Sequence, residues 1–309
     1  MVNSPRYFIR ILRIFILALT FFIMTVFFLL GKCSAAELKV TMLDVGQGDC
    51  FLISAPDGEN ILIDTGDASA RDKLLQQLET FNVERIDKLI LTHPHADHIA
   101  NAYYLVFPTP VGEVYDNGQI SSSIYYKRYL KACKEQNIPR YTLRDGDYFF
   151  LADGAYLFSS RSQDFKNIND SSLVLRLVYG DFSMLFTGDI SQNIERELFQ
   201  NYTLNSTVLK AAHHGSKTSN SIDFVKAVNP KYVFISAGLN NKFGHPHKES
   251  LENFLMAGVN PKNIFCTAFN GYVTITTDGS TVNVLPQYHN IWIYNYLGHR
   301  LLSRTLYEG

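Results

Sequence analysis

The chain has 309 residues, of which 46% are hydrophobic and 18% are charged, so it can bury a sizeable core and lacks the composition of a disordered protein. Its 28 basic and 29 acidic residues give a net charge of −1. This balance excludes duplex binding through a globally positive surface but leaves room for a local positive cleft. Among the four cysteines there is no C-x-x-C pair, and Cys50 and Cys266 fall in apolar runs, which favours buried thiols over a disulfide framework.

Residues 1–36 differ in kind from the rest of the chain. Three arginines precede an apolar run at 14–30, and small residues lead up to Glu37, an order typical of an export signal cleaved after Ala36. The run is long enough that an uncleaved N-terminal membrane anchor is an alternative. In either case the positive flank predicts an extracytoplasmic protein. Residues 1–36 hold four basic and no acidic residues, so the remainder has a net charge of −5.

The body of the chain alternates between strand and helix patterns. Its first half predicts two hairpins, a helix, a strand, two further helices (the second opened by a serine cap) and two short strands. The expected ranges are 38–44, 50–54, 60–64, 72–81, 88–92, 99–106, 121–136 and 147–160.

The second half follows a similar order, with one hairpin and then alternating helices and strands. The expected ranges are 173–179, 182–186, 191–200, 206–212, 221–228, 232–236, 248–257, 263–267, 271–277 and 281–285. Because no linker or low-complexity segment interrupts residues 37–285, we expect one domain there, built as a four-layer α/β/β/α sandwich. The extension 286–309 has no assigned role, and its apolar content predicts a docked strand or helix.

Histidines and carboxylates gather after the predicted strands. The run His93-Pro-His-Ala-Asp-His98 directly follows one apolar strand, and Asp189 follows another. Seven of the nine histidines lie at positions 93, 95, 98, 213, 214, 245 and 247. Loops that leave strand ends at one edge of a sheet can converge, and imidazole and carboxylate are the ligands that zinc prefers. The pattern predicts one metal centre assembled from distant segments.

The motifs resemble the metallo-β-lactamase superfamily, and more narrowly the extracytoplasmic hydrolase-like domain of ComEC-type DNA-uptake proteins. The resemblance covers roughly residues 38–285 and implies a free-standing version of that domain with the metallo-β-lactamase-like αββα fold. It rests on seven motifs in order: Leu43-Asp-Val-Gly-Gln-Gly-Asp49, Leu62-Ile-Asp-Thr-Gly66, Thr92-His-Pro-His-Ala-Asp-His98, Ser172-Leu-Val-Leu-Arg-Leu177, Phe186-Thr-Gly-Asp189, His213-His-Gly-Ser-Lys-Thr-Ser219 and Gly244-His-Pro246.

The resemblance implies two divalent metal ions, zinc or manganese, with magnesium as a further option. His93 and His95 would bind the first ion and Asp97 and His98 the second. Asp189 would bridge both, since two close dications need negative charge between them, and His245 would complete the second site. Water activated by such a pair supplies hydroxide near neutral pH, which would attack a phosphodiester. Asp97, His213 and His214 are the candidate catalytic residues.

One departure concerns the first metal. The superfamily usually supplies a further histidine to it, but this chain has no histidine between His98 and His213. Asn169 or Asp170 would substitute with an oxygen ligand, which favours manganese or magnesium. The alternative is a weakly held first ion and a one-metal enzyme.

Supporting roles are assigned to neighbouring polar residues. Asp64, and in second place Asp49, would accept the spare N–H of a ligand imidazole, although both also read as turn residues. His213 and His214 would point to opposite sides if their strand continues, so one at most would face the metals. Ser216 and Lys217 would seat a phosphate before the next helix, or else form a glycine turn with a helix cap.

Three functions are compatible with these residues. The first is an exported hydrolase of phosphodiesters, most specifically a DNA nuclease, which would be held at the membrane if residues 1–36 stay uncleaved. The second is a metallo-hydrolase of another ester, lactone or β-lactam. The third is a metal-depleted nucleic-acid-binding module, which the retention of His93, His95, Asp97, His98, Asp189 and His245 disfavours.

Overall fold

The structure, a computed structural model, describes residues 15–16, 18–20, 37–161 and 167–297. The predicted signal or anchor at 1–36 therefore lies almost wholly outside the described residues. By its internal contacts the chain divides into two units, Met1–Ala35 and Ala36–Gly309, and the fold described below is that of the second unit. Within the described part of the chain, no helix has both the length and the apolar character needed to cross a membrane.

The first sheet has eight strands in the order β15-β14-β1-β2-β3-β4-β5-β6. β15, β14, β1, β2 and β3 pair antiparallel, and β3 to β6 pair parallel. The strands are β1 (Leu38–Met42), β2 (Phe51–Ser54), β3 (Asn60–Ile63), β4 (Ile86–Leu91), β5 (Val111–Asp116), β6 (Arg140–Thr142), β14 (Val273–Thr277) and β15 (Val282–Pro286).

The second sheet has seven strands in the order β13-β12-β11-β10-β9-β8-β7. Here β7 to β10 pair antiparallel and β10 to β13 pair parallel. The strands are β7 (Tyr148–Phe150), β8 (Tyr156–Arg161), β9 (Leu173–Tyr179), β10 (Phe182–Phe186), β11 (Val208–Lys210), β12 (Tyr232–Ile235) and β13 (Ile264–Cys266).

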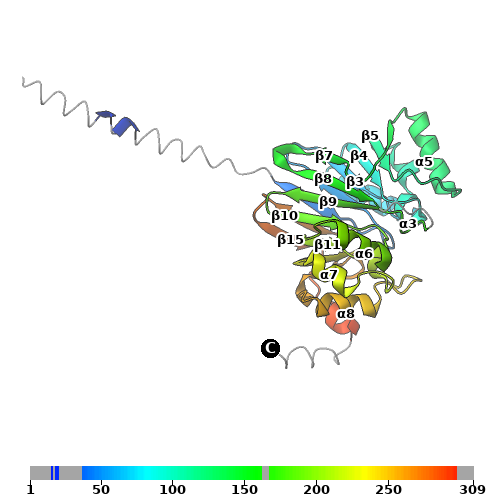
Figure 1. The fold of residues 1–309 in the computed structure, drawn as a ribbon. Coiled ribbons are helices and arrows are strands. Elements are labelled where there is room, and N and C mark those ends of the chain that lie inside the picture. Colours follow the sequence, from blue (N-terminus) through cyan, green and yellow to red (C-terminus); the bar gives the residue numbers. More distant parts are fainter. Residues whose placement is uncertain (1–14, 17, 21–36, 162–166, 298–309) are drawn as a thin grey trace, which may run out of the picture. The chain divides into compact units, whose positions relative to one another are not determined.

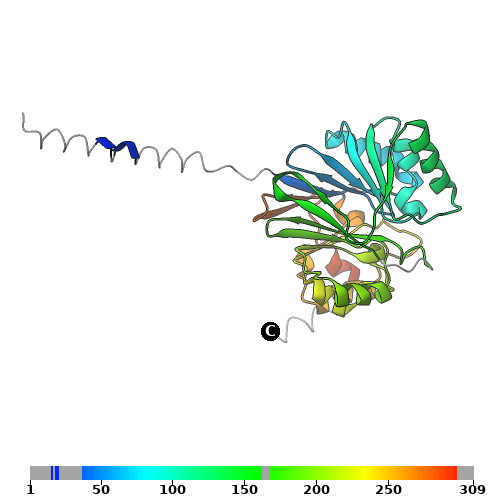
Figure 2. The same ribbon diagram turned by 45° about the horizontal axis from the view of Figure 1, so that its top comes forward.

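Helices cover the outer face of each sheet (Figures 1 and 2). The first sheet carries α2 (Arg71–Thr80), α3 (Ala96–Ile99), α4 (Ala102–Leu105) and α5 (Ile124–Glu135). The second carries α6 (Gln192–Asn201), α7 (Ile222–Val228), α8 (Lys248–Met256) and α10 (Ile293–Leu297), and the short α9 (Thr267–Asn270) follows β13. The side chain of Ser123 accepts a hydrogen bond from the backbone N–H of Tyr126 and so caps α5.

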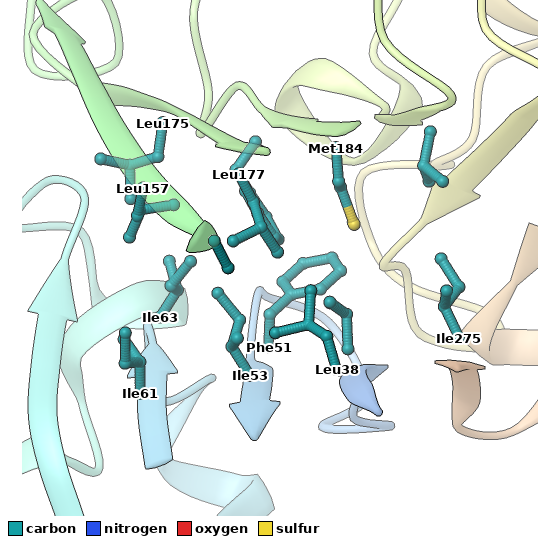
Figure 3. Close-up of a cluster of buried hydrophobic side chains, with 14 of the residues drawn as sticks. Leu38, Phe51, Ile53, Ile61, Ile63, Leu157, Leu175, Leu177, Met184 and Ile275 are labelled. Atoms are coloured by element: carbon teal, nitrogen blue, oxygen red, sulfur yellow. The ribbon is translucent and has the colours of Figure 1, made fainter. Parts of the chain in front are cut away.

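Three separate hydrophobic cores hold these layers together. The central core lies between the two sheets, where Phe51 and Ile53 face Leu177 and Met184 (Figure 3). The Phe51 ring meets Phe186 edge to face at 5.3 Å. The other two cores join each sheet to its own helices. Four layers need three such apolar interfaces, and the predicted αββα sandwich is confirmed.

The first sheet and its helices differ in part from the predicted elements. The helix expected at 99–106 is split into α3 and α4, because the Asn101 side chain donates to the carbonyls of Thr65 and Asp67 (2.9 and 2.7 Å) and fixes the chain at the break. Strands β5 and β6 were not predicted. In the extension, Trp292 and Ile293 at the start of α10 are buried on the second sheet's helical side. Cys50, Cys133 and Cys266 are buried and free, as predicted for Cys50 and Cys266.

Glu195 is a buried carboxyl on α6 whose protonation should make stability depend on pH. It accepts hydrogen bonds from the backbone N–H groups of Asn220 and Ser221, and burial raises its pKa from 4.5 to about 7. Because its folded-state pKa is the higher one, the native state binds the extra proton and loses stability as pH rises from 4.5 to 7. Relative to Glu195→Gln, wild-type unfolding free energy should fall by roughly 3 kcal/mol over that range. Urea unfolding of both proteins over this pH range measures the change in unfolding free energy. A difference between wild type and Glu195→Gln that stays constant with pH would contradict the prediction.

Candidate metal centre

The carboxyl ends of the parallel strands bring the polar segments together. Asp64 follows β3, His93 to His98 follow β4, Asp189 follows β10, and His213 and His214 follow β11. Parallel strands deliver their following loops to one edge of a sheet. The two edges are tied to each other where the N–H of Leu173, at the start of β9, donates to the Thr92 carbonyl at 2.9 Å. Segments dozens of residues apart therefore meet in one place.

Four ligand atoms form the densest group in this place. One atom from each of Asp97, His98, Asp189 and His214 lies within 4.8 Å of the others. Asp189 Oδ2 is 3.3 Å from His98 Nε2 and 3.5 Å from His214 Nε2, and Asp97 Oδ2 is 3.3 Å from His214 Nε2. All but Asp97 are buried. Two imidazoles and two carboxylates at these separations match the donor set of a divalent metal site.

Two of the imidazoles are oriented by acceptors behind them. His98 Nδ1 donates to Asp64 Oδ2 at 2.7 Å, and His214 Nδ1 donates to the Ser236 carbonyl at 2.9 Å and lies 3.2 Å from Asp49 Oδ1. Each contact leaves Nε2 facing the centre, and both Nε2 atoms are buried without a hydrogen-bond partner in the described part of the chain. Unpaired buried polar atoms are costly. A cation bound there would satisfy both, so the residues fit a metal ion.

A second pair of nitrogens lies near Asp189. His93 Nε2 is 3.1 Å from His95 Nδ1 and 3.9 Å from Asp189 Oδ2. Behind the ring, His93 Nδ1 contacts the hydroxyls of Thr92 and Ser172 (3.1 and 3.2 Å). Burial lowers the pKa of His93 well below its usual value, which keeps it neutral and able to bind metal. Asp189 Oδ2 thus lies 3.3 to 3.9 Å from the Nε2 atoms of His93, His98 and His214, which suits a bridging carboxylate.

The two candidates for the missing ligand of the first ion occupy different places. The side chain of Asn169 contacts His95, and its buried Oδ1 has no hydrogen-bond partner in the described part of the chain. Asp170 Oδ1 instead accepts the N–H of Ser191 at 2.9 Å just before α6. Of the two, Asn169 is the residue placed to give an oxygen to an ion held by His93 and His95.

Replacing Asn169 by alanine is expected to weaken one of two bound ions and leave the other unchanged. The loss of a supporting ligand should lower the affinity of the first site by about 10- to 100-fold. Metal titration by calorimetry and bound-metal analysis after dialysis measure this change. The matched control is Asp170→Asn, which removes a charge one residue away. Equal weakening by both variants would contradict the assignment to Asn169.

The turn after β11 differs from the predicted continuing strand. β11 ends at Lys210, and His213 and His214 both have positive φ (50° and 55°), a conformation unusual for residues other than glycine. Because this turn replaces the strand, the two rings do not alternate. Both approach Asp189, with His213 Nε2 at 3.7 Å from Asp189 Oδ2 and the His213 side chain 27% exposed. Left-handed non-glycine residues often mark functional sites.

His214 groups with Asp97, His98 and Asp189, and His245 lies next to it. The His245 ring centroid lies 5.9 Å from that of His214, and His245 is not among the four grouped ligand atoms. His245 borders the centre, and its buried Nδ1 has no hydrogen-bond partner in the described part of the chain. Its role as a metal ligand, which the family resemblance implies, stays a prediction.

The predicted phosphate seat is not formed as expected. Ser216 is buried, its hydroxyl contacts that of Thr218 at 3.0 Å, and its carbonyl accepts from Asn220 and Ser250. The next helix, α7, begins only at Ile222 with Ser221 as its cap. Ser216 is therefore used within the turn, whereas Lys217 remains exposed at the rim of the centre.

Lys210 is a functional candidate that is not among the site residues predicted from the sequence. Its side chain is 1% exposed, and its Nζ lies 2.5 Å from Asp49 Oδ2, donates to the Gly188 carbonyl at 2.8 Å and lies 3.7 Å from Asp189 Oδ1. Asp49 thus serves both His214 and Lys210. A lysine inside the apolar run Val208-Leu-Lys-Ala-Ala212 was the available signal, because a buried lysine needs an ionic partner.

The centre carries more negative than positive charge. Four carboxylates, those of Asp49, Asp64, Asp97 and Asp189, surround one buried ammonium. Burial opposes protonation of His98 and His214, but the charge of Asp189, together with Asp64 or Asp49, outweighs it and raises the pKa of both imidazoles well above the usual value. The site thus draws in positive charge, and a divalent cation would replace those protons.

Known proteins resemble this chain in sequence and in fold. The family model described as Metallo-beta-lactamase superfamily matches residues 43–238. ComE operon protein 3 of Bacillus subtilis (strain 168) is 32% identical over 249 residues, which are 74% of this chain and 32% of that protein. Competence protein ComA of Neisseria gonorrhoeae is 34% identical over 226 residues, which are 72% of this chain and 30% of that protein. The chain spans about a third of the length of these relatives.

Among solved structures, the metallo-beta-lactamase fold protein YhfI from Bacillus subtilis matches with a TM-score of 0.52 and 14% identity. The match covers 81% of this chain and 100% of that chain. At this identity the likeness concerns the fold alone.

Proposed function

The chain belongs to the metallo-β-lactamase superfamily, and on that basis we propose that it is an exported phosphodiesterase that cleaves DNA. Superfamily membership and the histidine–aspartate centre make it a metal-dependent hydrolase with competence-related homologues. The proposal includes three further statements. The substrate is a phosphodiester, the chain is exported by means of residues 1–36, and the centre binds two divalent ions (zinc or manganese, with magnesium as a further option).

One observation carries the proposal. Asp189 Oδ2 lies 3.3 to 3.9 Å from the Nε2 atoms of four histidines: His93, His98, His213 and His214. A single carboxylate oxygen shared in this way suits two divalent ions about 3.5–4 Å apart, the arrangement that clamps the attacking and leaving oxygens of a phosphodiester. Bound there, such ions would lower the pKa of water and offset the charge on the phosphoryl oxygens.

The residues around the centre would have different roles. His93, His95 and Asn169 would hold one ion, Asp97, His98 and His214 the other, and Asp189 would lie between them. His213 is the most exposed of the four imidazoles around Asp189. It is therefore the imidazole that substrate can reach, and it would hydrogen-bond the leaving oxygen.

The choice of DNA rests on the relatives and the motifs. The competence relatives align with most of this chain, and the seven motifs resemble those of DNA-uptake proteins. Export and a membrane contact through residues 1–36 rest on the three arginines and the apolar run at 14–30.

A cleavage assay tests the proposal. The purified protein should cleave single- or double-stranded DNA when zinc, manganese or magnesium is added, and a chelator should stop cleavage. A parallel panel of a lactone, a β-lactam and a simple ester tests the competing hydrolase classes. No DNA cleavage with any of the three metals would refute the proposal. DNA binding by a protein that retains no metal would favour a binding module instead.

A further inference from the structure

The loop that follows β12 carries exposed apolar side chains beside the metal centre. In it, Leu239 is 64% exposed and Phe243 is 49% exposed. The start of the loop is anchored where the N–H of Gly238 donates to the Gln47 side chain at 3.3 Å. Large exposed apolar side chains next to a candidate active site are a feature of ligand contacts.

Asn241 holds this loop in one shape. Its Oδ1 accepts the N–H groups of Phe243 and His245 (3.1 and 3.0 Å), and its Nδ2 donates to the carbonyls of Gly238 and His245 (2.8 and 2.6 Å). The N–H of Gly244 also donates to the Asn241 carbonyl. The Asn241 side chain thus makes four hydrogen bonds that fix the loop carrying the exposed Phe243 ring. A contact surface fixed before binding loses little entropy when a ligand arrives.

The aromatic rings lead outward from the metal centre in steps. His214, which contacts Asp97 and Asp189, is followed by His245 at 5.9 Å between ring centroids and 33° between planes. Phe243 stacks on His245 at 5.6 Å and 19°. The outermost of these three rings is thus nearly parallel to its neighbour and is about half exposed. This is the geometry of a platform on which a further flat ring can stack.

Positive side chains border the same platform. Lys242 Nζ lies over the Phe243 ring, 5.0 Å from its centre, and a base that stacks on Phe243 would take its place on that face. Exposed Lys217 is also close by, since its backbone N–H donates to His247 Nδ1 and the His247 ring lies 4.9 Å from that of His245. Aromatic faces flanked by lysines are how proteins hold single-stranded nucleic acid, because bases stack on the rings and phosphates meet the cations. An acyl chain would use the aromatic face but not the lysines.

We propose that Phe243, backed by His245, stacks an unpaired nucleobase next to the scissile phosphate, while Lys242 and Lys217 meet the flanking phosphates. This deepens the proposed function and rests on it. A base inside a duplex has both faces covered by its neighbours, so the platform selects single-stranded DNA or a splayed end. Phe243 is thereby a specificity-determining residue of the site.

The test compares Phe243→Ala with Leu239→Ala on two substrates. Leu239 is the matched control because it is an exposed apolar residue of the same loop that has no place in the row of stacked rings. The substrates are a short single strand and the same strand with an abasic site beside the cleaved bond. Loss of one stacked base costs about 1–3 kcal/mol, or roughly 5- to 150-fold. Phe243→Ala should lower kcat/KM that much on the normal strand and hardly at all on the abasic strand, and Phe243→Trp should restore it.

Binding to a cleavage-resistant phosphorothioate strand, followed by fluorescence anisotropy, separates this proposal from the proposed function. If no diester is cleaved but binding still depends on Phe243 and on the base, the platform stands and the phosphodiesterase proposal falls. If DNA is cleaved while Phe243→Ala behaves like Leu239→Ala, the platform is overturned and the phosphodiesterase stands. Absence of both binding and cleavage overturns both.

Discussion

Asp189→Ala is expected to lose both bound ions and most hydrolytic activity. Asp189 Oδ2 approaches His93 as well as His98 and His214. In the described part of the chain, Asp97 is the one other carboxylate that groups with His98 and His214. Removal of Asp189 deprives both ions of their shared negative ligand. Losing several kcal/mol of metal-derived transition-state stabilisation corresponds to on the order of a thousandfold in rate. Bound-metal analysis and the DNA cleavage assay, run on the same preparation, measure the two losses together.

Two further variants serve as controls for Asp189→Ala. Asp189→Asn keeps the shape of the side chain but removes its charge, so it should lose metal to nearly the same extent. Asp181→Ala removes an exposed aspartate from the turn between β9 and β10, on the same hairpin, and should keep full metal content. Unchanged activity in Asp189→Ala would refute the centre described here.

The sequence was sufficient where local pattern determines the outcome. Apolar runs gave most of the strands, and strand-following residues such as His93, His98 and Asp189 meet in the structure because parallel strands present their ends at one edge. β5 was missed because Gly112 and Glu113 interrupt its apolar run, and β6 because its three residues are exposed and show no alternation.

The details of the centre depend on long-range geometry that the pattern does not contain. That His213 and His214 both approach Asp189 depends on the left-handed turn that they form. Likewise, Asn169 and Asp170 are adjacent in sequence, and the structure shows that Asp170 Oδ1 is paired with Ser191 while Asn169 Oδ1 has no partner in the described part of the chain. Both residues offer a side-chain oxygen, so the sequence pattern alone does not tell which of them is free to bind a metal ion.

Lys210→Met is expected to be the most destabilising single change near the centre. Methionine fills a similar volume but leaves Asp49 Oδ2, the Gly188 carbonyl and Asp189 Oδ1 without their buried ammonium. Removing one partner of a buried ion pair costs about 3–5 kcal/mol, because the remaining charge stays buried and uncompensated. Urea unfolding of the metal-free protein at neutral pH measures this loss. Lys127→Met, on the exposed side of α5, is the matched control and should change stability by less than about 0.5 kcal/mol.

The charge of Lys210, rather than its packing, should account for the loss, and two measurements separate them. Adding Asp49→Asn to Lys210→Met removes one of the uncompensated carboxylates, so the double variant should be more stable than the single one. A divalent ion supplies the missing positive charge and binds only the folded state, so zinc or manganese should stabilise Lys210→Met more than wild type. If neither change restores stability, Lys210 acts through packing alone and its electrostatic role at Asp49 and Asp189 is refuted.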